Sequence, residues 1–168
     1  GKVDIGNKYE GHKVENRPGG DGVGFIFHTG NVNKLGQSGA SIGMGGIPAA
    51  FGFKLDSWHN TSNPDAAQKA NADPQYGGQA WRTNAFGAFY SSNNAGIVST
   101  IRGEKALNPN PNGQWVDFKI DYKGNTKEFT VTYGTQTWTT KIDKTSRSMS
   151  NESKNALNAK GATYALSF

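Results

Sequence analysis

The segment Trp115–Tyr133 constrains the fold most strongly, because apolar and polar side chains alternate along it in two runs. In both Trp115–Tyr122 and Lys127–Tyr133, every second residue is Val, Ile, Phe or Tyr. Such alternation places one apolar and one polar face on a β-strand. The connection 123–126 reads KGNT, which supplies turn residues. The segment therefore predicts an antiparallel hairpin with one buried face.

Other short runs of the same kind predict five further strands: Val23–Phe27, Ala50–Asp56, Phe86–Tyr90, Gln136–Ile142 and Thr163–Phe168. Helical signals are weak and are limited to 65–72 and 151–160. Many short strands, loops rich in Gly, Asn and Pro, and little helix predict an all-β antiparallel sandwich. A length of 168 residues fits a single domain over 1–168.

Composition excludes several classes of function. The chain has no cysteine, which removes disulfides, a thiol nucleophile and Cys-ligated zinc. No run of 18 apolar residues is present, so no direct membrane insertion is expected. The net charge is +5, but the Lys and Arg residues are scattered singly, so no nucleic-acid partner is expected either.

One segment carries oxygen donors suited to a metal ion. Asp56 and Asn60 flank Trp58 where a predicted strand runs into a loop, and Asp73 lies further along that loop. Carboxylate, amide and backbone carbonyl oxygens are the ligands that Ca²⁺ prefers. A calcium site would then consist of Asp56, the Trp58 carbonyl, Asn60 and Asp73. The alternative is an Asx-rich turn in which these side chains bind their own backbone.

Three ordered motifs resemble those of the L-type (legume-like) lectin domain. GDGVGFIF at 20–27 resembles the family's A-D-G-L-A-F-F strand, and GASIGM at 39–44 resembles G-x-x-L-G-L. FKLDSWHN at 53–60 resembles V-E-F-D-T-F-x-N, and the pair at 73–74 resembles the D-P that follows. The resemblance extends in particular to the lectin modules of Gram-positive surface adhesins of the staphylococcal serine-rich-repeat type. It implies a concanavalin-like jelly roll with long functional loops.

The resemblance implies a role for each matching residue. Asp21 would accept hydrogen bonds from sugar hydroxyls, and the Gly20–Asp21 peptide bond would be cis. Gly39 would donate its backbone N–H to the sugar. Asn60 would bind calcium through its carbonyl oxygen and the sugar through its NH₂ group. Trp58 would place its carbonyl on the ion and its ring beneath the sugar. Calcium would thereby preorganise the site.

The chain also departs from the family pattern. Legume lectins hold a second metal through a Glu and a His, but this chain has Lys54 and Ala85 near those positions. An ammonium group opposes a second cation, so one Ca²⁺ and no manganese are expected. The opening strand and the final back-sheet strand of the family have no counterpart here, so we expect a domain lacking terminal strands at both ends.

Some polar and aromatic residues outside the motifs leave alternatives open. His12, His28 and His59 form no metal or triad arrangement, and solvated or packing roles are expected for them. Trp81-Arg82 either extends the sugar site, with Arg82 pairing an acidic sugar, or anchors the loop. Specificity would reside in the loops 75–83 and 91–111.

These observations predict a non-catalytic, calcium-dependent carbohydrate-binding module of a bacterial cell-surface adhesin, attached to the wall through regions outside the segment. Its partners would be glycans, sialylated or other acidic ones among them. A protein-binding or homophilic adhesion module is the main alternative. A glycoside hydrolase is disfavoured because the strand at 53–60 lacks the two glutamates that related hydrolases carry.

Overall fold

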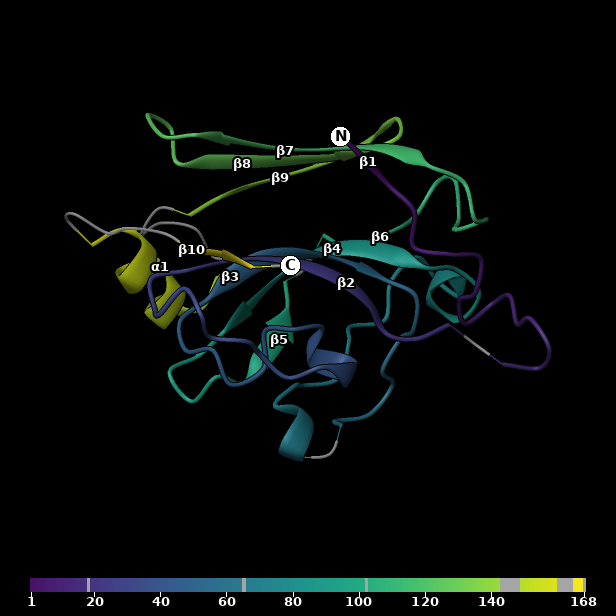
Figure 1. The fold of residues 1–168 in the computed structure, drawn as a ribbon, viewed down its shortest axis with the longest axis horizontal. Coiled ribbons are helices and arrows are strands. Elements are labelled where there is room, and N and C mark those ends of the chain that lie inside the picture. The colour runs from purple at the N-terminus through teal and green to yellow at the C-terminus, as the bar shows by residue number, and fades with distance from the viewer. Residues whose placement is uncertain (18, 65, 102, 143–148, 160–164, 168) are drawn as a thin grey trace.

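Two antiparallel sheets lie face to face in the computed structural model, with a layer of loops beneath the larger sheet (Figure 1). The structure describes residues 1–17, 19–64, 66–101, 103–142, 149–159 and 165–167. The four-stranded sheet has the order β1 (Lys2–Val3), β7 (Val116–Lys123), β8 (Glu128–Tyr133), β9 (Gln136–Lys141). The six-stranded sheet has the order β10 (Ala165–Ser167), β2 (Gly22–His28), β3 (Phe51–Asp56), β4 (Phe86–Ser92), β5 (Val98–Thr100), and β6 (Lys105–Ala106) also pairs with β4.

The predicted sandwich and hairpin are confirmed. Strands β7 and β8 pair antiparallel, with Ile120 opposite Val131. Each of the other predicted strands coincides with an observed strand, although residues 163, 164 and 168 of the last one lie outside the described residues. The very short strands β1, β5 and β6 were not predicted, because two or three residues are too few to show a period.

Within the described residues, helical structure is limited to short pieces. The 3₁₀ turns η1 (Gly39–Ser41), η2 (Ala66–Gln68) and η3 (Ala80–Arg82) lie in the loops, and α1 (Asn151–Leu157) falls within the predicted helical segment. The Ser150 hydroxyl caps α1 by accepting a hydrogen bond from the N–H of Ser153 at 3.1 Å. No helix in the described part of the chain is long and apolar enough to cross a membrane.

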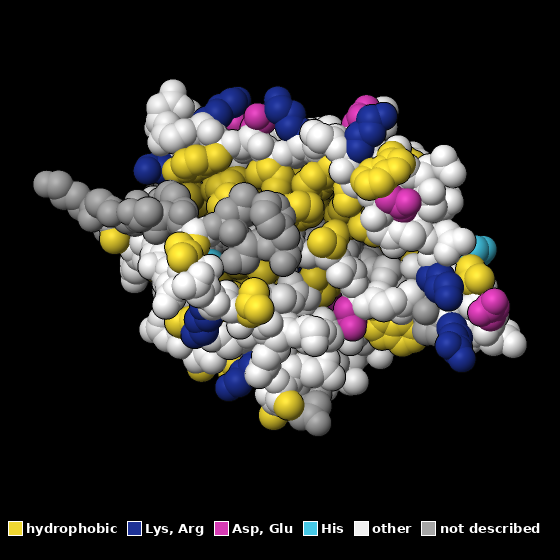
Figure 2. All heavy atoms as spheres, in the orientation of Figure 1, with side chains coloured by type: hydrophobic (Ala, Val, Ile, Leu, Met, Phe, Trp, Pro, Cys, Tyr) yellow, Lys and Arg dark blue, Asp and Glu magenta, His cyan; other side chains and the backbone are white. Residues whose placement is uncertain are grey.

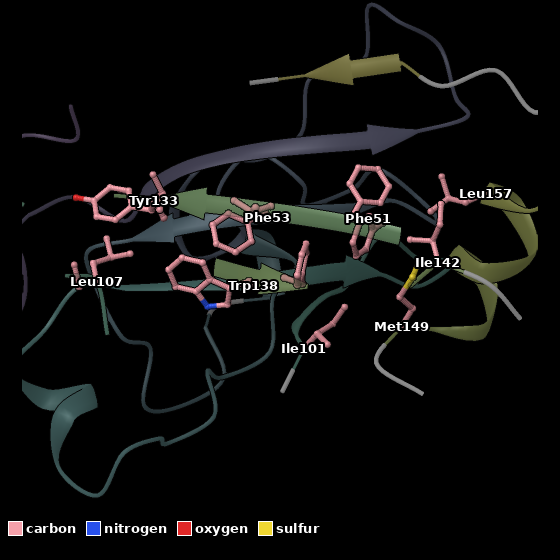
Figure 3. Packing of buried hydrophobic residues seen from close by; sticks show 14 of the residues in the cluster. Phe51, Phe53, Ile101, Leu107, Tyr133, Trp138, Ile142, Met149 and Leu157 are labelled. Carbon is pink, nitrogen blue, oxygen red and sulfur yellow. The ribbon is translucent and has the colours of Figure 1, made fainter. Parts of the chain in front are cut away.

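The main core lies between the two sheets. Phe51, Phe53 and Leu55 of β3 point toward the four-stranded sheet and are almost fully buried. The Phe53 ring packs edge-on against Trp138 of β9, with ring centroids 5.2 Å apart (Figure 3). Figure 2 shows apolar side chains in the gap between the sheets and basic side chains over the outer face of the four-stranded sheet. The alternation in the sequence thus separates core from solvent in this sheet.

The outer face of the six-stranded sheet is also buried, because the loops between its strands fold back over it. Ile42, Met44 and Ile47 from the loop after β2 pack with Tyr90 of β4 in a second apolar cluster. All six residues of β3 are consequently buried, including Lys54 and Asp56, whose positions alternate with the core phenylalanines. The loops therefore enclose polar side chains at the end of β3, and these side chains form the candidate site.

Candidate functional site

An ion-pair cluster is buried where β3 ends. The Lys54 ammonium lies 2.7 Å from Asp56 Oδ2 and 2.6 Å from Asp73 Oδ1. At most 3% of any of the three side chains is exposed. Lys54 and Asp56 share a face because they are two residues apart on the strand. Asp73 comes from the long loop after β3, as the sequence analysis expected.

Asn60 and Asp73 bind each other across the base of that loop. The N–H of Asp73 donates to the Asn60 carbonyl at 2.8 Å, and the N–H of Asn60 donates to Asp73 Oδ2 at 3.1 Å. The Thr100 hydroxyl donates to Asp73 Oδ1 at 2.6 Å. Nearby, the N–H of Asn71 donates to the Val98 carbonyl at 2.9 Å, which ties the loop to β5. These bonds fix Asp73 beside the end of β3.

Asp56 and Trp58 form the turn that was the alternative to a metal site. The N–H of Trp58 donates to Asp56 Oδ1 at 2.9 Å, which is the geometry of an Asx-turn. The Trp58 carbonyl and Asn60 Oδ1 accept no hydrogen bond from any described residue. The two interpretations are therefore compatible, because the turn leaves these two oxygens available as ligands.

Burial and the lysine act in opposite directions on the acidic groups. Burial raises the pKa of Asp56 to about 7, against the attraction of the Lys54 ammonium. Burial also disfavours ionised Asp73, but Lys54, Thr100 and Asn60 outweigh it and lower the pKa of Asp73. Burial disfavours the charged form of Lys54, yet the two carboxylates raise its pKa. Lys54 therefore carries its charge at neutral pH.

Asp21 and Gly39, two of the predicted sugar contacts, line one cavity of about 450 Å³. Asp21 also borders a second cavity of about 550 Å³, which the N-terminal segment 3–8 lines on its other side. Burial raises the pKa of the Asp21 carboxyl group, although the Lys54 ammonium works against that rise. A carboxylate and a backbone N–H therefore lie at one concave surface, and their role as sugar contacts stays a prediction.

Ser57 connects the Asp21 cavities to the ion-pair cluster. Its N–H donates to the Asp21 carbonyl at 2.9 Å, and its hydroxyl donates to the Gly20 carbonyl. The prediction of a cis bond between Gly20 and Asp21 is wrong, since the cis bond among the described residues is Asn108–Pro109.

Gly39 has the geometry of a backbone contact. Its φ of +74° lies in the left-handed region, and a Cβ there would approach Gln68 Oε1 to 2.6 Å. Gln68 Oε1 accepts a hydrogen bond from the neighbouring N–H of Ala40 at 2.9 Å. The N–H of Gly39 itself donates to no described residue. This leaves a backbone donor at the cavity wall.

The structure does not bring the Trp58 ring and the Asn60 amide, the other two predicted sugar contacts, to the cavities beside Asp21. The Asn60 amide turns its Nδ2 toward Asp73 Oδ2 at 3.4 Å instead of away from the ion-pair cluster. No group of three or more His, Asp or Glu residues in the described ranges has the spacing of a metal cage. The Lys54 ammonium lies between the two carboxylates.

The histidine and tryptophan of this region have packing roles. His59 is buried, its ring is tilted against that of Trp81 with centroids 4.7 Å apart, and its Nε2 lies 3.0 Å from the Pro74 carbonyl oxygen. Trp81 is 5% exposed, which favours the loop-anchor interpretation over a sugar-contact role for its ring. Arg82 lies over the Trp81 ring at 4.6 Å. The packing role predicted for His59 is therefore confirmed.

Sequence reasoning missed the contribution of the N-terminal segment. Glu10 Oε2 accepts a hydrogen bond from the N–H of His59 at 3.1 Å, and the N–H of Glu10 donates to the Ser57 carbonyl at 3.0 Å. Glu10 therefore clamps the backbone on both sides of Trp58. Nothing in the local sequence signals this contact, because the two segments are 49 residues apart.

Comparisons with known proteins agree with the fold and with the motifs. The family model for the legume lectin β-barrel domain matches residues 1–164. A protein named serine-rich adhesin for platelets from Staphylococcus aureus is 48% identical over 151 residues, covering 84% of this chain and 6% of that protein. The protein of the same name from strain MRSA252 is also 48% identical, over 84% of this chain and 10% of its own length. The chain thus spans a tenth or less of these relatives.

Proposed function

Because this chain belongs to the L-type lectin family, we propose that it is a calcium-dependent, non-catalytic glycan-binding module of a bacterial surface adhesin. The observation that carries the proposal is the convergence of Asp56, Asn60 and Asp73 at the end of β3. These three side chains and the Trp58 carbonyl offer hard oxygen atoms in one place, which suits Ca²⁺. The names of the relatives support a role in adhesion outside the cell.

Calcium would act on the structure of the site and would not contact the sugar directly. The ion would draw on Asp56, the Trp58 carbonyl, Asn60 Oδ1 and Asp73. Since Asn60 Oδ1 and Nδ2 exchange places on a half-turn of the amide, an amide oxygen directed at the ion leaves the NH₂ group for a sugar hydroxyl. This arrangement accounts for a calcium requirement in sugar binding.

The glycan would bind in the cavity shared by Asp21 and Gly39. A carboxylate acceptor and a backbone N–H that donates to no described residue, both at one concave surface, would fix the orientation of a sugar ring. The segments 75–83 and 91–111, the second of which contains the short strands β5 and β6, would select among glycans, acidic ones included. A shallow site with few contacts gives weak affinity for a single sugar, so tight attachment would need several modules acting together.

A glycan array probed with and without calcium tests the proposal. Binding to a defined set of glycans that disappears in chelator and in Asp21→Asn is the expected result. The matched control is Asp117→Asn, an exposed aspartate on the outer face of β7. A folded protein that binds no glycan in either condition would contradict the proposal.

Such a negative result would favour the alternative of a protein-binding adhesion module. The relatives are named for platelets and not for a sugar, which keeps this second function in view. It predicts capture of a protein ligand that survives both chelator and Asp21→Asn. Glycoside hydrolysis remains disfavoured, because both carboxylates already accept hydrogen bonds within the protein. Asp56 accepts from Lys54 and from the Trp58 N–H. Asp73 accepts from Lys54 and from the Thr100 hydroxyl.

A further inference from the structure

The Lys54 ammonium bridges two carboxylates at the end of β3 and divides their oxygen atoms into two sets. Asp56 Oδ2 and Asp73 Oδ1 face the ammonium at 2.7 and 2.6 Å. The other two oxygens face the loop: Asp56 Oδ1 accepts from the Trp58 N–H, and Asp73 Oδ2 accepts from the Asn60 N–H. The second set therefore points toward the residues that supply the remaining proposed calcium ligands.

The fold makes room for this lysine. On the neighbouring strands, Gly24 of β2 and Ala88 of β4 lie directly opposite Lys54, and both are small. The ring of Phe86 lies 4.9 Å from the ammonium and closes the remaining side. Strand β3 is central in its sheet, which makes this a rigid support for the lysine (Figure 1).

Charge explains what the lysine contributes. Two buried carboxyl groups this close repel each other when ionised, and burial adds a desolvation cost. The Lys54 ammonium lies 2.7 Å from Asp56 Oδ2 and 2.6 Å from Asp73 Oδ1, so one charge attracts both carboxyl groups. Without a cation between them, the two groups would move apart, and the Asn60–Asp73 contact would lose its support.

We infer that Lys54 is a positioning residue, a built-in cation that holds Asp56 and Asp73 in the calcium-binding arrangement when no calcium is bound. The inference rests on the proposed calcium site. It adds that the base of the loop, at Asn60 and Asp73, stays ordered in the metal-free protein, because Lys54 supplies a positive charge to the site from the chain itself. Calcium removal is therefore reversible without refolding of the loop.

Amide hydrogen exchange of the whole chain in chelator tests this inference. The amides of Asn60 and Asp73 report on the loop, because each donates to the other residue. In the unmodified protein both amides should remain protected in chelator. In Lys54→Met they should exchange about tenfold faster or more in chelator, and calcium should restore their protection. Lys54→Met should also show a larger calcium-induced rise in Tm than the unmodified protein.

The matched control is Lys119→Met. Lys119 also pairs with an aspartate two residues away, at 2.7 Å on β7, but its side chain is 67% exposed. This variant should leave both reporter amides unchanged. If Lys54→Met does not fold even with calcium, Lys54→Gln keeps a hydrogen-bond donor without the charge, and the same accelerated exchange is expected in it.

Two results would overturn the inference. One is loss of protection at Asn60 and Asp73 when chelator is added to the unmodified protein. The other is protection in chelator that is the same in Lys54→Met or Lys54→Gln as in the unmodified protein. Both readouts are made without sugar, so they are independent of the glycan array. A protein that binds no glycan but shows the expected exchange would lose its proposed function and keep the role of Lys54.

Discussion

Asn60 and Asp73 donate hydrogen bonds to each other, from N–H to carbonyl at 2.8 Å and from N–H to carboxylate at 3.1 Å. This reciprocal pair closes the base of a loop that otherwise has little regular structure. It brings two residues that are 13 positions apart next to Asp56 at the strand end. A loop of this length gains order only if something at its base offsets the entropy of closure.

Asp73→Ala is expected to abolish calcium binding and to destabilise the domain. The substitution removes a proposed calcium ligand and the acceptor of the Asn60 N–H, and it leaves Lys54 with one carboxylate. Breaking a buried ion pair from one side costs about 3–5 kcal/mol. Denaturant unfolding in chelator and calorimetric titration with calcium measure the two effects. The control is Asp121→Ala, at an exposed lysine–aspartate pair on β7, which should change neither the free energy of unfolding nor the calcium affinity. Calcium binding by Asp73→Ala would show that Asp73 is not a ligand.

Calcium binding should depend on pH near neutrality because the pKa of Asp56 is raised to about 7. Calcium needs the ionised carboxylate, so its affinity should fall about tenfold for each pH unit below that pKa. Stability without calcium should have the opposite trend. Between the ordinary aspartate pKa of 3.8 and the raised pKa of about 7, the folded state binds more protons at Asp56 than the unfolded state, so the free energy of unfolding falls as pH rises through that range. Tm scans from pH 5 to 8 with calcium and with chelator measure both slopes. Parallel slopes in the two conditions would contradict this assignment to Asp56.

The sheets were predictable from sequence because the hairpin residues obey a two-residue period. Phe118 and Val131 point inward, whereas Lys119 and Thr130 point outward. The same period was misleading for solvent exposure in β3. Lys54 alternates with Phe53 as a surface residue would, yet loops from elsewhere in the chain bury it. Such loop packing has no local sequence signal.

The residues of the candidate site were likewise predictable only in part. The motif around Asp56 and Asn60 was recognisable, because its oxygen donors lie close in sequence and match a family pattern. For Lys54, the sequence indicated only that its charge would oppose a second metal. Its contact with Asp73 could not be predicted, because the two residues are 19 positions apart. The hydrogen bond between Glu10 and the His59 N–H could not be predicted, because the N-terminal segment that carries Glu10 has no periodic pattern and lies far from His59 in the sequence.

Gly39→Ala should separate sugar binding from calcium binding. The added Cβ would approach Gln68 Oε1 to 2.6 Å at a φ of +74°, so the backbone at the cavity wall must shift. We expect glycan affinity to fall about tenfold or more, with calcium affinity unchanged. Gly46→Ala is the matched control, because its φ of +79° imposes the same strain of about 1–2 kcal/mol but its Cβ would meet no atom within 4 Å. Equal glycan affinities in the two variants would show that the Gly39 N–H is not a sugar contact.

Glu10→Ala should weaken calcium binding from outside the ligand set. The side chain accepts the His59 N–H, and its loss frees the backbone that presents the Trp58 carbonyl. A buried or half-buried N–H left without a partner costs about 1–3 kcal/mol, so calcium affinity should drop roughly tenfold while the fold persists. Glu10→Gln keeps an acceptor oxygen in place and should bind calcium nearly as the unmodified protein does. Calorimetric titration of the three proteins with calcium at one pH tests this prediction. The glutamine side chain retains the hydrogen bond and loses only the charge. If both variants weaken calcium binding equally, the charge of Glu10 matters and not its hydrogen bond.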